Sequence, residues 1–397
     1  MSDFVPGTGW PLDVFAGLRR RPDVEAENLF AHDAADRLLL ETAAEQYPGR
    51  IGDGARVAVL GDQYGALALG LAAAGVRGHR VHQDGRSGEL ALEANADEAG
   101  LGGTFAAIEE ASAAVAGARL VLLQLPRSLD VLSEWARLIA AAGGEDVVVL
   151  AGGRVKHMAL AMNDALGTYF GSVRAGLASR KARVLTATEP LREAALAAPD
   201  PVEAGTADAG LPTPLQLRAV PGSFGGARLD PGTRFLLPRL VGPDGLPERL
   251  PGGGPVVDLG CGNGTIAAFL ALTRPELRVL ACDQSTAAVT ASRLTAEANG
   301  VSARVEVRRA DGLDGLDDGS VAAVVLNPPF HMGSTVHPGI ALKLFADAGR
   351  ALAPGGRLWC VWNSHLQYRR HLERLVGPTR QLDRNSKFTV TVSTRRA

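Results

Sequence analysis

A glycine-rich loop that joins an apolar strand to an apolar helix constrains the fold of this chain more than any other feature. The strand covers Val256–Leu259, the loop carries glycines at 260, 262 and 264, and residues 265–273 are apolar at helical spacing. A strand, a tight glycine turn and a helix in this order are typical of a βαβ unit with a parallel sheet. The C-terminal half is therefore expected to be an α/β domain.

The rest of this half continues to alternate strands with helices. Ser285 can cap a helix that runs to about Ala298. Further short apolar runs indicate strands, and a second helix ends before a Pro-Gly-Gly stop. The expected strands are 278–282, 305–307, 321–326, 357–362 and 387–393, and the second helix is 341–352. We interpret the pattern as a doubly wound sheet, which binds ligands beyond the carboxyl ends of its strands.

The N-terminal half repeats this plan. Residues 57–65 parallel the strand and glycine loop of the second half. Gly61 precedes Asp84 by 23 positions, and Gly260 precedes Asp283 by the same 23. Because several elements match in this way, duplication explains the pattern better than coincidence. The expected organisation is a first domain at 1–186, an Ala/Pro-rich linker without strand or helix at 187–214, and a second domain at 215–397.

The first copy has lost side chains that carry chemistry in the second. Val59 stands for Asp258, Gln63 for Gly262 and Gln124 for Asn327. We therefore expect the first domain to bind no cofactor and to hold or position a large substrate.

Composition narrows the class of protein. The chain has 397 residues, enough for two cores, and 46% of them are hydrophobic, as in globular proteins. Its three cysteines are too few and too scattered for a disulfide framework or a zinc site, which fits a reducing cytoplasm. We see no signal peptide, and the longest apolar run, 66–75, is about half the length of a membrane span. His331, His337 and His365 match no usual metal spacing, so no metal is expected.

Charge is balanced overall but uneven along the chain. The formal net charge is −2, whereas residues 154–183 carry six basic side chains against one acid. Residues 367–397 carry eight basic side chains against two acids. These runs are either solvated faces or surfaces for a nucleic acid, and charge alone does not decide between them.

The glycine loop fits S-adenosylmethionine. Glycines allow the backbone to approach the methionine part of that cofactor closely. Asp258 can orient the loop or receive the cofactor's ammonium group through water. Asp283, after the second strand, can accept the ribose hydroxyls, and Asp311, after the third, can meet the adenine amine. The expected cofactor-binding residues are Asp258, Gly260, Cys261, Gly262, Asn263, Gly264, Asp283, Asp311 and Asn327. The spacing does not match a dinucleotide fingerprint, and no phosphate-binding Gly-Lys-Thr element is present.

The turn Asn327-Pro328-Pro329-Phe330 follows the fourth strand and is the expected catalytic motif. An exocyclic amine is planar, because its lone pair is delocalised into the ring. The Asn327 side-chain oxygen and the Pro328 carbonyl can accept its two N–H groups and aim the lone pair at a sulfonium methyl. The prolines fix the turn, and Phe330 offers a face on which a base can stack.

Two neighbouring segments are candidates for substrate binding. Upstream of the glycine loop, Phe224 and Arg234 flank a segment that runs into an apolar helix and could close over the pocket. A cap without a functional role explains that segment equally well. The candidate substrate-binding residues are Phe224, Arg234, Phe330 and His331.

With these motifs, the chain resembles the bacterial ribosomal RNA guanine-N2 methyltransferases with duplicated domains, from about residue 34 to the C-terminus. The branch that acts on large-subunit RNA is the most similar, and the small-subunit enzyme is a near relative. The segments that carry the resemblance are 61–67, 229–236, 258–264, 327–331, 363–368 and 385–388.

The resemblance implies two tandem doubly wound Rossmann-like methyltransferase domains, the first degenerate. It implies S-adenosylmethionine as cofactor, ribosomal RNA as partner, and residues 327–330 as the holder of the target guanine. We expect a cytoplasmic monomer or weak dimer without a membrane or metal partner.

Other functions stay open at this point. A protein glutamine N-methyltransferase also carries Asn-Pro-Pro, although normally with Tyr where this chain has Phe330. A small-molecule N-methyltransferase would leave the degenerate domain and its basic run without a purpose. A non-catalytic RNA-binding assembly factor would not need the intact loop at Asp258 or Asn327.

Overall fold

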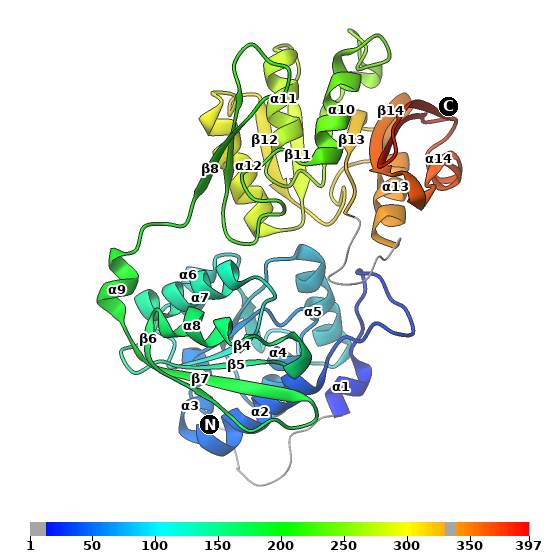
Figure 1. The fold of residues 1–397 in the computed structure, drawn as a ribbon. Helices are drawn as coiled ribbons and strands as arrows, with labels where there is room; N and C mark the ends of the chain where they lie inside the picture. The colour runs from blue at the N-terminus through cyan, green and yellow to red at the C-terminus, as the bar shows by residue number, and fades with distance from the viewer. Residues whose placement is uncertain (1–12, 330–338, 397) are drawn as a thin grey trace. The chain divides into compact units, whose positions relative to one another are not determined.

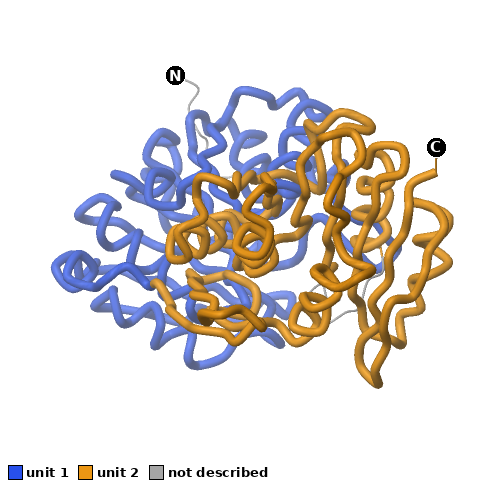
Figure 2. The backbone as a smooth tube through the Cα atoms, turned by 90° about the horizontal axis from the view of Figure 1, so that it is seen from above, with its two compact units in different colours: residues 1–201 blue, residues 202–397 orange. Residues whose placement is uncertain are grey.

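The computed structural model describes residues 13–329 and 339–396. The chain divides into two compact units, residues 1–201 and residues 202–397 (Figure 2). In the described residues, each unit is built on a seven-stranded mixed sheet with helices on both faces (Figure 1). The two strand orders are β3-β2-β1-β4-β5-β7-β6 and β12-β11-β10-β13-β14-β16-β15, so the units repeat one topology. This confirms the expected fold class of two tandem doubly wound domains.

In unit 2, five parallel strands are followed by an antiparallel pair at one edge. Helices α10, α11 and α12 pack on one face of the sheet, and α13 and α14 pack on the other. The strands are β10 (Val256–Leu259), β11 (Val279–Asp283), β12 (Val305–Arg309), β13 (Val321–Leu326), β14 (Leu352–Asn363), β15 (Thr379–Arg384) and β16 (Phe388–Thr394). The helices are α10 (Pro231–Val241), α11 (Thr265–Thr273), α12 (Thr286–Ala298), α13 (Gly339–Ala351) and α14 (Arg369–Leu375), with short turns η3 (Pro251–Gly253) and η4 (Ser364–Leu366).

Unit 1 repeats this arrangement. Helices α1, α2, α4 and α5 pack on one face of its sheet, and α6 to α9 pack on the other. The strands are β1 (Val57–Leu60), β2 (His79–His82), β3 (Phe105–Ala107), β4 (Leu120–Gln124), β5 (Val148–Arg154), β6 (Phe170–Ala175) and β7 (Ala182–Pro190). The helices are α1 (Asp13–Gly17), α2 (Ala34–Gln46), α3 (Pro48–Ile51), α4 (Ala66–Ala73), α5 (Arg86–Glu98), α6 (Ala111–Val115), α7 (Leu129–Ala142), α8 (Ala161–Gly167) and α9 (Arg192–Ala197), with turns η1 (Gly54–Arg56) and η2 (Val155–His157).

The segment expected to connect the domains without strand or helix contains both, and the division between the two units falls within it, between residues 201 and 202. It holds the end of β7, all of α9 and the strand β8 (Glu203–Ala207). β8 pairs antiparallel with β9 (Leu215–Ala219). This hairpin packs on α12, where Thr295 and Asn299 form hydrogen bonds with the backbone of β9. The sequence hid it because only β9 alternates apolar and polar residues.

The structure also corrects the register of the repeat. In each unit the first loop glycine donates its N–H to a carbonyl of the neighbouring strand, that of His82 in unit 1 and that of Cys282 in unit 2. The next residue is Gln83 in unit 1 and Asp283 in unit 2. Asp84 therefore lies one position beyond the place of Asp283, and the equal spacing in sequence does not reflect equal positions in the fold.

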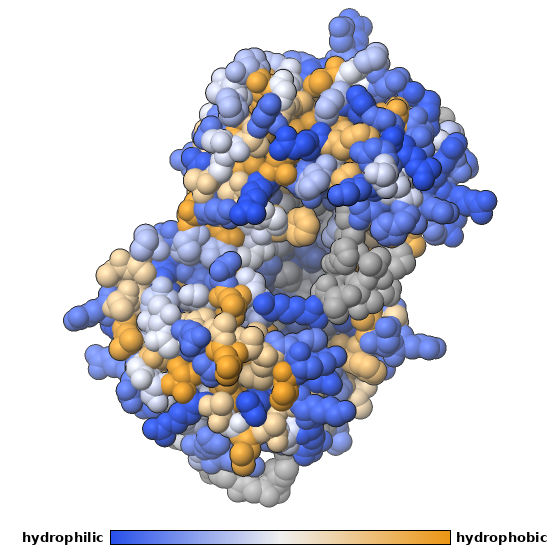
Figure 3. Space-filling model, in the orientation of Figure 1, coloured by the Kyte–Doolittle hydropathy of each residue, from blue (hydrophilic) through white to orange (hydrophobic). Residues whose placement is uncertain are grey.

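The surface that Figure 3 shows is mostly hydrophilic, as expected for domains whose apolar side chains are gathered in interior cores. On the face in view in Figure 3, hydrophobic residues form small patches among hydrophilic ones on each unit. In the described part of the chain, every helix is too short or too polar to cross a lipid bilayer.

The lack of a side chain at Gly264 allows α11 to pack against α12, and a substitution there tests this packing. A Cβ atom at Gly264 would lie 2.5 Å from Ser292 Oγ and 2.8 Å from its Cα, and the residue has a φ of 75°. Gly300 has a similar φ of 67° but open space around it, so it is a matched control. We expect Gly264→Ala to lower the free energy of unfolding by about 1–2 kcal/mol more than Gly300→Ala, measured by urea denaturation. Equal losses would show that backbone strain, and not packing, sets the requirement.

Candidate active site

The glycine loop is attached to the neighbouring strand. Gly260 and Cys261 both donate backbone N–H groups to the carbonyl of Cys282, at 2.8 and 3.0 Å. Gly262 donates its N–H to Asp283 Oδ2 at 3.0 Å. The φ angles of the three loop glycines are 70°, 53° and 75°, all in the left-handed region that side chains disfavour. The loop is therefore held open as a rigid turn at the carboxyl end of the sheet.

Open space lies over this loop in unit 2 and is filled in unit 1. Among the described residues, a Cβ atom at Gly260 or Gly262 would meet no heavy atom within 4 Å. The matching Gly61 of unit 1 faces the ring of Trp135, with the nearest ring carbon 3.1 Å from such a Cβ. Unit 2 therefore has room for a ligand against its loop backbone, and unit 1 has an indole in the same place.

Asp258 is a buried carboxyl below the loop. Its Oδ2 accepts the N–H of Ala267 at 3.0 Å, in the first turn of α11, and its Oδ1 has no hydrogen-bond partner among the described residues. Burial raises the pKa of Asp258 to about 7, with the hydrogen bond from Ala267 opposing this shift and the charge of Asp283 adding to it. A cationic group nearby would favour the ionised form.

The other two acids lie at the ends of the next strands. Asp283 ends β11, and besides Gly262 it accepts the N–H of Ser285 at 3.0 Å, which fixes its carboxylate. Asp311 follows β12, is largely buried and forms an ion pair with Lys343 of α13. The three acids therefore lie at the carboxyl ends of three adjacent strands, as the sequence predicts.

Cys261 and Asn263 make contacts that stabilise the glycine loop. Cys261 is buried, and burial raises its thiol pKa well above the usual range. The Asn263 side chain donates to the carbonyls of Gly226 and Arg228, at 2.9 and 3.0 Å. Asn263 thus ties the glycine loop to the segment that leads into α10.

The two upstream candidates lie on the surface. Phe224 is 74% exposed, in the segment before the one that Asn263 holds. Arg234 is exposed and donates to the carbonyl of Asp208 at 3.1 Å. Neither contacts the glycine loop through a described hydrogen bond.

Asn327 is a polar side chain whose nitrogen is held by two hydrogen bonds. It follows β13, which pairs with β10 so that Leu326 lies opposite Leu259, next to Gly260. Its Nδ2 donates to Asp230 Oδ1 at 2.8 Å and to Thr233 Oγ1 at 3.0 Å. Its Oδ1 is buried and has no partner among the described residues. The carboxamide is therefore fixed with its oxygen left to accept a hydrogen bond.

Sequence reasoning missed Asp230 and Thr233. Asp230 caps α10 and accepts the N–H of Thr233 at 2.9 Å. An Asp-Pro-x-Thr helix start was visible in the sequence, but its contact with Asn327 spans about 95 residues of chain and has no local signal. Pro328 is buried and Pro329 exposed, whereas Phe330 and His331 lie outside the described residues.

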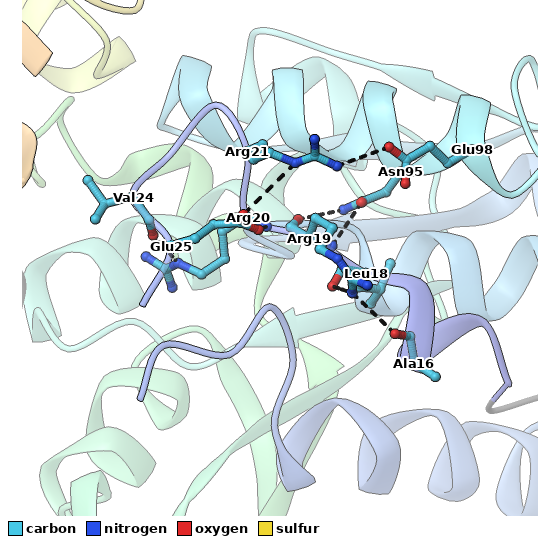
Figure 4. Close-up of polar contacts among 9 residues, drawn as sticks. All are labelled: Ala16, Leu18, Arg19, Arg20, Arg21, Val24, Glu25, Asn95 and Glu98. Atoms are coloured by element: carbon cyan, nitrogen blue, oxygen red, sulfur yellow. Dashed lines mark hydrogen bonds and ion pairs between the residues drawn. The ribbon is translucent and has the colours of Figure 1, made fainter. Parts of the chain in front are cut away.

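In unit 1, a segment near the N-terminus contacts the altered loop through Tyr64, and its polar contacts with α5 are drawn in Figure 4. Asn95 of α5 exchanges two hydrogen bonds with the backbone of Arg19, at 2.9 and 2.8 Å, and Arg21 pairs with Glu98. The Arg20 guanidinium lies 4.5 Å from the ring centre of Tyr64, the residue at the place of Asn263. This segment and Trp135 are consistent with a first domain that binds no cofactor.

No cluster of three or more His, Cys, Asp or Glu side chains suited to a metal occurs among residues 13–329 and 339–396. The cysteines at 261, 282 and 360 are all buried and free.

Comparison with known proteins agrees with this architecture. Residues 214–392 match the family model described as Methyltransferase small domain, and residues 13–191 match the RLMG N-terminal domain. A ribosomal RNA large subunit methyltransferase G of Pseudomonas fluorescens is 35% identical over 376 residues, 94% of this chain and 96% of the relative. Its counterpart in Streptomyces coelicolor is 34% identical over 390 residues, again 94% and 96% of the two chains.

A solved structure has the same fold. It is a 16S ribosomal RNA N2 guanine methyltransferase of T. thermophilus in complex with AdoMet and guanosine, with a TM-score of 0.72 and 23% identity over 92% of each chain. Fold and site thus define a methyltransferase that depends on S-adenosylmethionine. The chain belongs to the family of ribosomal RNA large subunit methyltransferase G, which confirms the resemblance noted in the sequence.

The pKa of Asp258 gives a prediction for cofactor binding. If the cationic cofactor lies against Asp258, it would be attracted by the ionised carboxylate, and burial raises the pKa of that carboxyl to about 7 in the free protein. We expect the affinity for S-adenosylmethionine to rise by up to about tenfold per unit between about pH 5.5 and 7. Asp258→Asn removes this dependence in isothermal titration calorimetry.

Asp62 provides the matched control for that experiment. It is also a buried helix-capping carboxyl with a pKa raised to about 7 by burial, but it lies in unit 1. Asp62→Asn should leave the pH profile of the parent chain unchanged. A parent affinity that is constant over this pH range would contradict the assignment.

Proposed function

We propose that the chain methylates the exocyclic N2 of a guanine in large-subunit ribosomal RNA. The observation that supports this most directly is the Asn327 carboxamide, whose nitrogen is held by Asp230 and Thr233 while its buried oxygen has no partner among the residues that the structure describes. The names of the relatives supply large-subunit RNA as substrate, and the solved relative was bound to guanosine.

The chain's own groups activate the amine by orientation. Asn327 Oδ1 and the carbonyl of Pro328 accept the two N–H groups of guanine N2, which bends the nitrogen out of the ring plane and exposes its lone pair. S-adenosylmethionine supplies an electrophilic methyl group when it is bound. That methyl group would pass to the exposed lone pair while sulfur keeps the S–C electron pair, and N2 would then release a proton to solvent. Alignment of this kind contributes roughly 7–11 kcal/mol in favourable cases.

The cofactor would lie over the glycine loop. Gly260 and Gly262 leave room for it, and Asp258 would face its ammonium group directly or through water. Asp283 would accept the ribose hydroxyls, and Asp311 would meet the adenine amine. Cys261, Asn263 and Gly264 would shape the loop backbone around it.

Substrate residues outside the loop are also part of the proposal. Phe224 and Arg234 are exposed beside the segment that Asn263 holds, where they could contact RNA. Phe330 and His331 would face the target base. Unit 1 would position the RNA, and the chain would act in the cytoplasm as a monomer or weak dimer.

One assay tests the reaction. Purified protein and methyl-labelled cofactor are incubated with ribosomes and with RNA from a strain that lacks this gene, and the RNA is digested to nucleosides. We expect the label in N2-methylguanosine from large-subunit RNA. Label in small-subunit RNA would show that the substrate is small-subunit RNA, and label in protein would refute the proposal.

A second experiment tests the held carboxamide. Thr233→Val removes one acceptor of Asn327 Nδ2 at nearly constant volume, and Thr233→Ser keeps it. Loss of one such bond is worth about 1 kcal/mol, so we expect kcat to fall about five- to tenfold in Thr233→Val and to stay near the parent value in Thr233→Ser.

Asn327→Ala sets the scale for that comparison. It should lower kcat by about 100-fold or more, as the loss of an oriented transition-state partner does. Cofactor affinity, measured by calorimetry, should change by less than about twofold in all three variants, because the carboxamide acts on the amine. Lost cofactor binding in Asn327→Ala would mean that the turn is only structural.

A further inference from the structure

Unit 1 retains a copy of the held carboxamide. Gln124 ends β4 at the place of Asn327, since Leu123 lies opposite Leu60 as Leu326 lies opposite Leu259. Its Nε2 donates to Asp36 Oδ1 at 2.7 Å. Asp36 belongs to the first turn of α2, as Thr233 belongs to the first turn of α10.

When it is ionised, Asp36 fixes this carboxamide with Nε2 turned toward it, although burial raises the pKa of Asp36 well above its usual range. Asp36 is 1% exposed, and its Oδ2 accepts the N–H of Asp33 at 2.7 Å. Gln124 Oε1 is buried and has no hydrogen-bond partner among the described residues. A buried acceptor without a partner costs about 1–3 kcal/mol, so a donor that reaches this oxygen would recover free energy of that order.

Methyl transfer cannot be that use, because Trp135 fills the space over Gly61. The oxygen Oε1 accepts hydrogen bonds and donates none, and the opposite end of the amide is engaged by Asp36. The group it suits is therefore an N–H donor, such as the exocyclic amine of a nucleobase.

Three cationic side chains lie at or just beyond the carboxyl ends of β4 and β5, as Gln124 does. Arg127 follows β4 by three residues, Arg154 ends β5, and Lys156 lies in η2. Gln124 is paired with Gly152, and Arg154 lies two residues further along on the same face. Strand geometry places the Cα atoms of Arg154 and Gln124 about 8 Å apart.

These three cations share a lack of recorded side-chain contacts within the described residues. In the part of the chain that the structure describes, no side-chain hydrogen bond or ion pair involves Arg127, Arg154 or Lys156, and Arg154 Nε is buried without an acceptor. All three lie near His157, whose pKa is lowered by burial and then by their charges. Unpaired cations beside a base acceptor match the chemistry of a nucleotide, a phosphate next to an amine-bearing base.

We propose that unit 1 binds a second, unmodified nucleotide of single-stranded RNA at this place, with Gln124 Oε1 accepting a hydrogen bond from the exocyclic amine of its base and Arg127, Arg154 and Lys156 contacting the backbone phosphates. The site rests on the proposed RNA substrate and adds to it a base contact outside the catalytic unit. It assigns a specificity role to a domain that has lost the cofactor pocket.

The base contact is tested from the ligand side first. The full chain carrying Asn327→Ala, without cofactor, is titrated with a short fluorescent oligoadenosine and with the same oligomer made of purine riboside, which lacks only the exocyclic amine. We expect the oligomer without the amine to bind about five- to tenfold more weakly. Equal affinities would overturn the proposal, and no variant in unit 1 is needed for that outcome.

Variants of Gln124 then locate the contact. Gln124→Leu in the same background should bind both oligomers with the weaker affinity, and Gln124→Asn, a smaller change that withdraws the oxygen, should do the same. If the two oligomers still differ as in the parent, the base is read elsewhere and the site is refuted. Since no methyl transfer takes place, these results are independent of the methylation assay.

The phosphate contacts have a matched control in Arg174 of β6. Arg174 is exposed, as Lys156 is, and its side chain has no hydrogen bond or ion pair among the described residues. It lies beside Thr186, which pairs with Leu150, four residues before Arg154. Arg154→Gln and Lys156→Gln should weaken both oligomers equally and reduce the slope of log affinity against log salt by about 0.7 each. Arg174→Gln should change neither. An equal effect of Arg174→Gln would indicate diffuse attraction and refute the phosphate contacts.

Discussion

The hydrogen bonds that hold the Asn327 carboxamide are the constraint on which the site depends. An amide can present either end, and only the oxygen can accept the N–H groups of an amine. Asp230 and Thr233 fix the choice by accepting both hydrogens of Nδ2. Because Asp230 also caps α10, the start of that helix and the end of β13 are positioned together. The packing of one helix thus sets the orientation of one oxygen.

The two units solve the same structural problem with different residues. In unit 2, the first turn of α11 is bound by Asp258 from the strand, through the N–H of Ala267. In unit 1, Val59 occupies that strand position, and Asp62 in the loop binds the N–H groups of Leu67 and Ala68 instead. Helix α4 of unit 1 thus still has a carboxylate bound to its first turn, although the space for a ligand over the loop is lost. Duplication therefore preserved what folding needs at this turn and released what only the ligand needs.

Much of this architecture could be predicted from the sequence, since buried parallel strands such as Val321–Leu326 are continuous apolar runs. The edge strand β15 was missed because Arg380, Asp383 and Arg384 make it polar, as exposed edges are. The acids after the strands were found because strand ends converge. The contact of Asn327 with α10 was not, because local periodicity carries no information about pairs so distant in the chain. The exact spacing of Asp84 misled for a related reason: a one-residue difference between the copies shifts an acid past its place.

The position of Trp135 over Gly61 affects how the free energy of unfolding of each unit depends on the cofactor. In unit 1 the indole of Trp135 occupies the place of the cofactor, so the cofactor cannot stabilise that unit. In unit 2 the place is open, and the stabilisation grows with the logarithm of the ratio of cofactor concentration to its dissociation constant. Only the C-terminal half should therefore become more resistant to heat and proteases as the cell's supply of methyl donor rises. The N-terminal half would keep a constant resistance whatever the nutritional state.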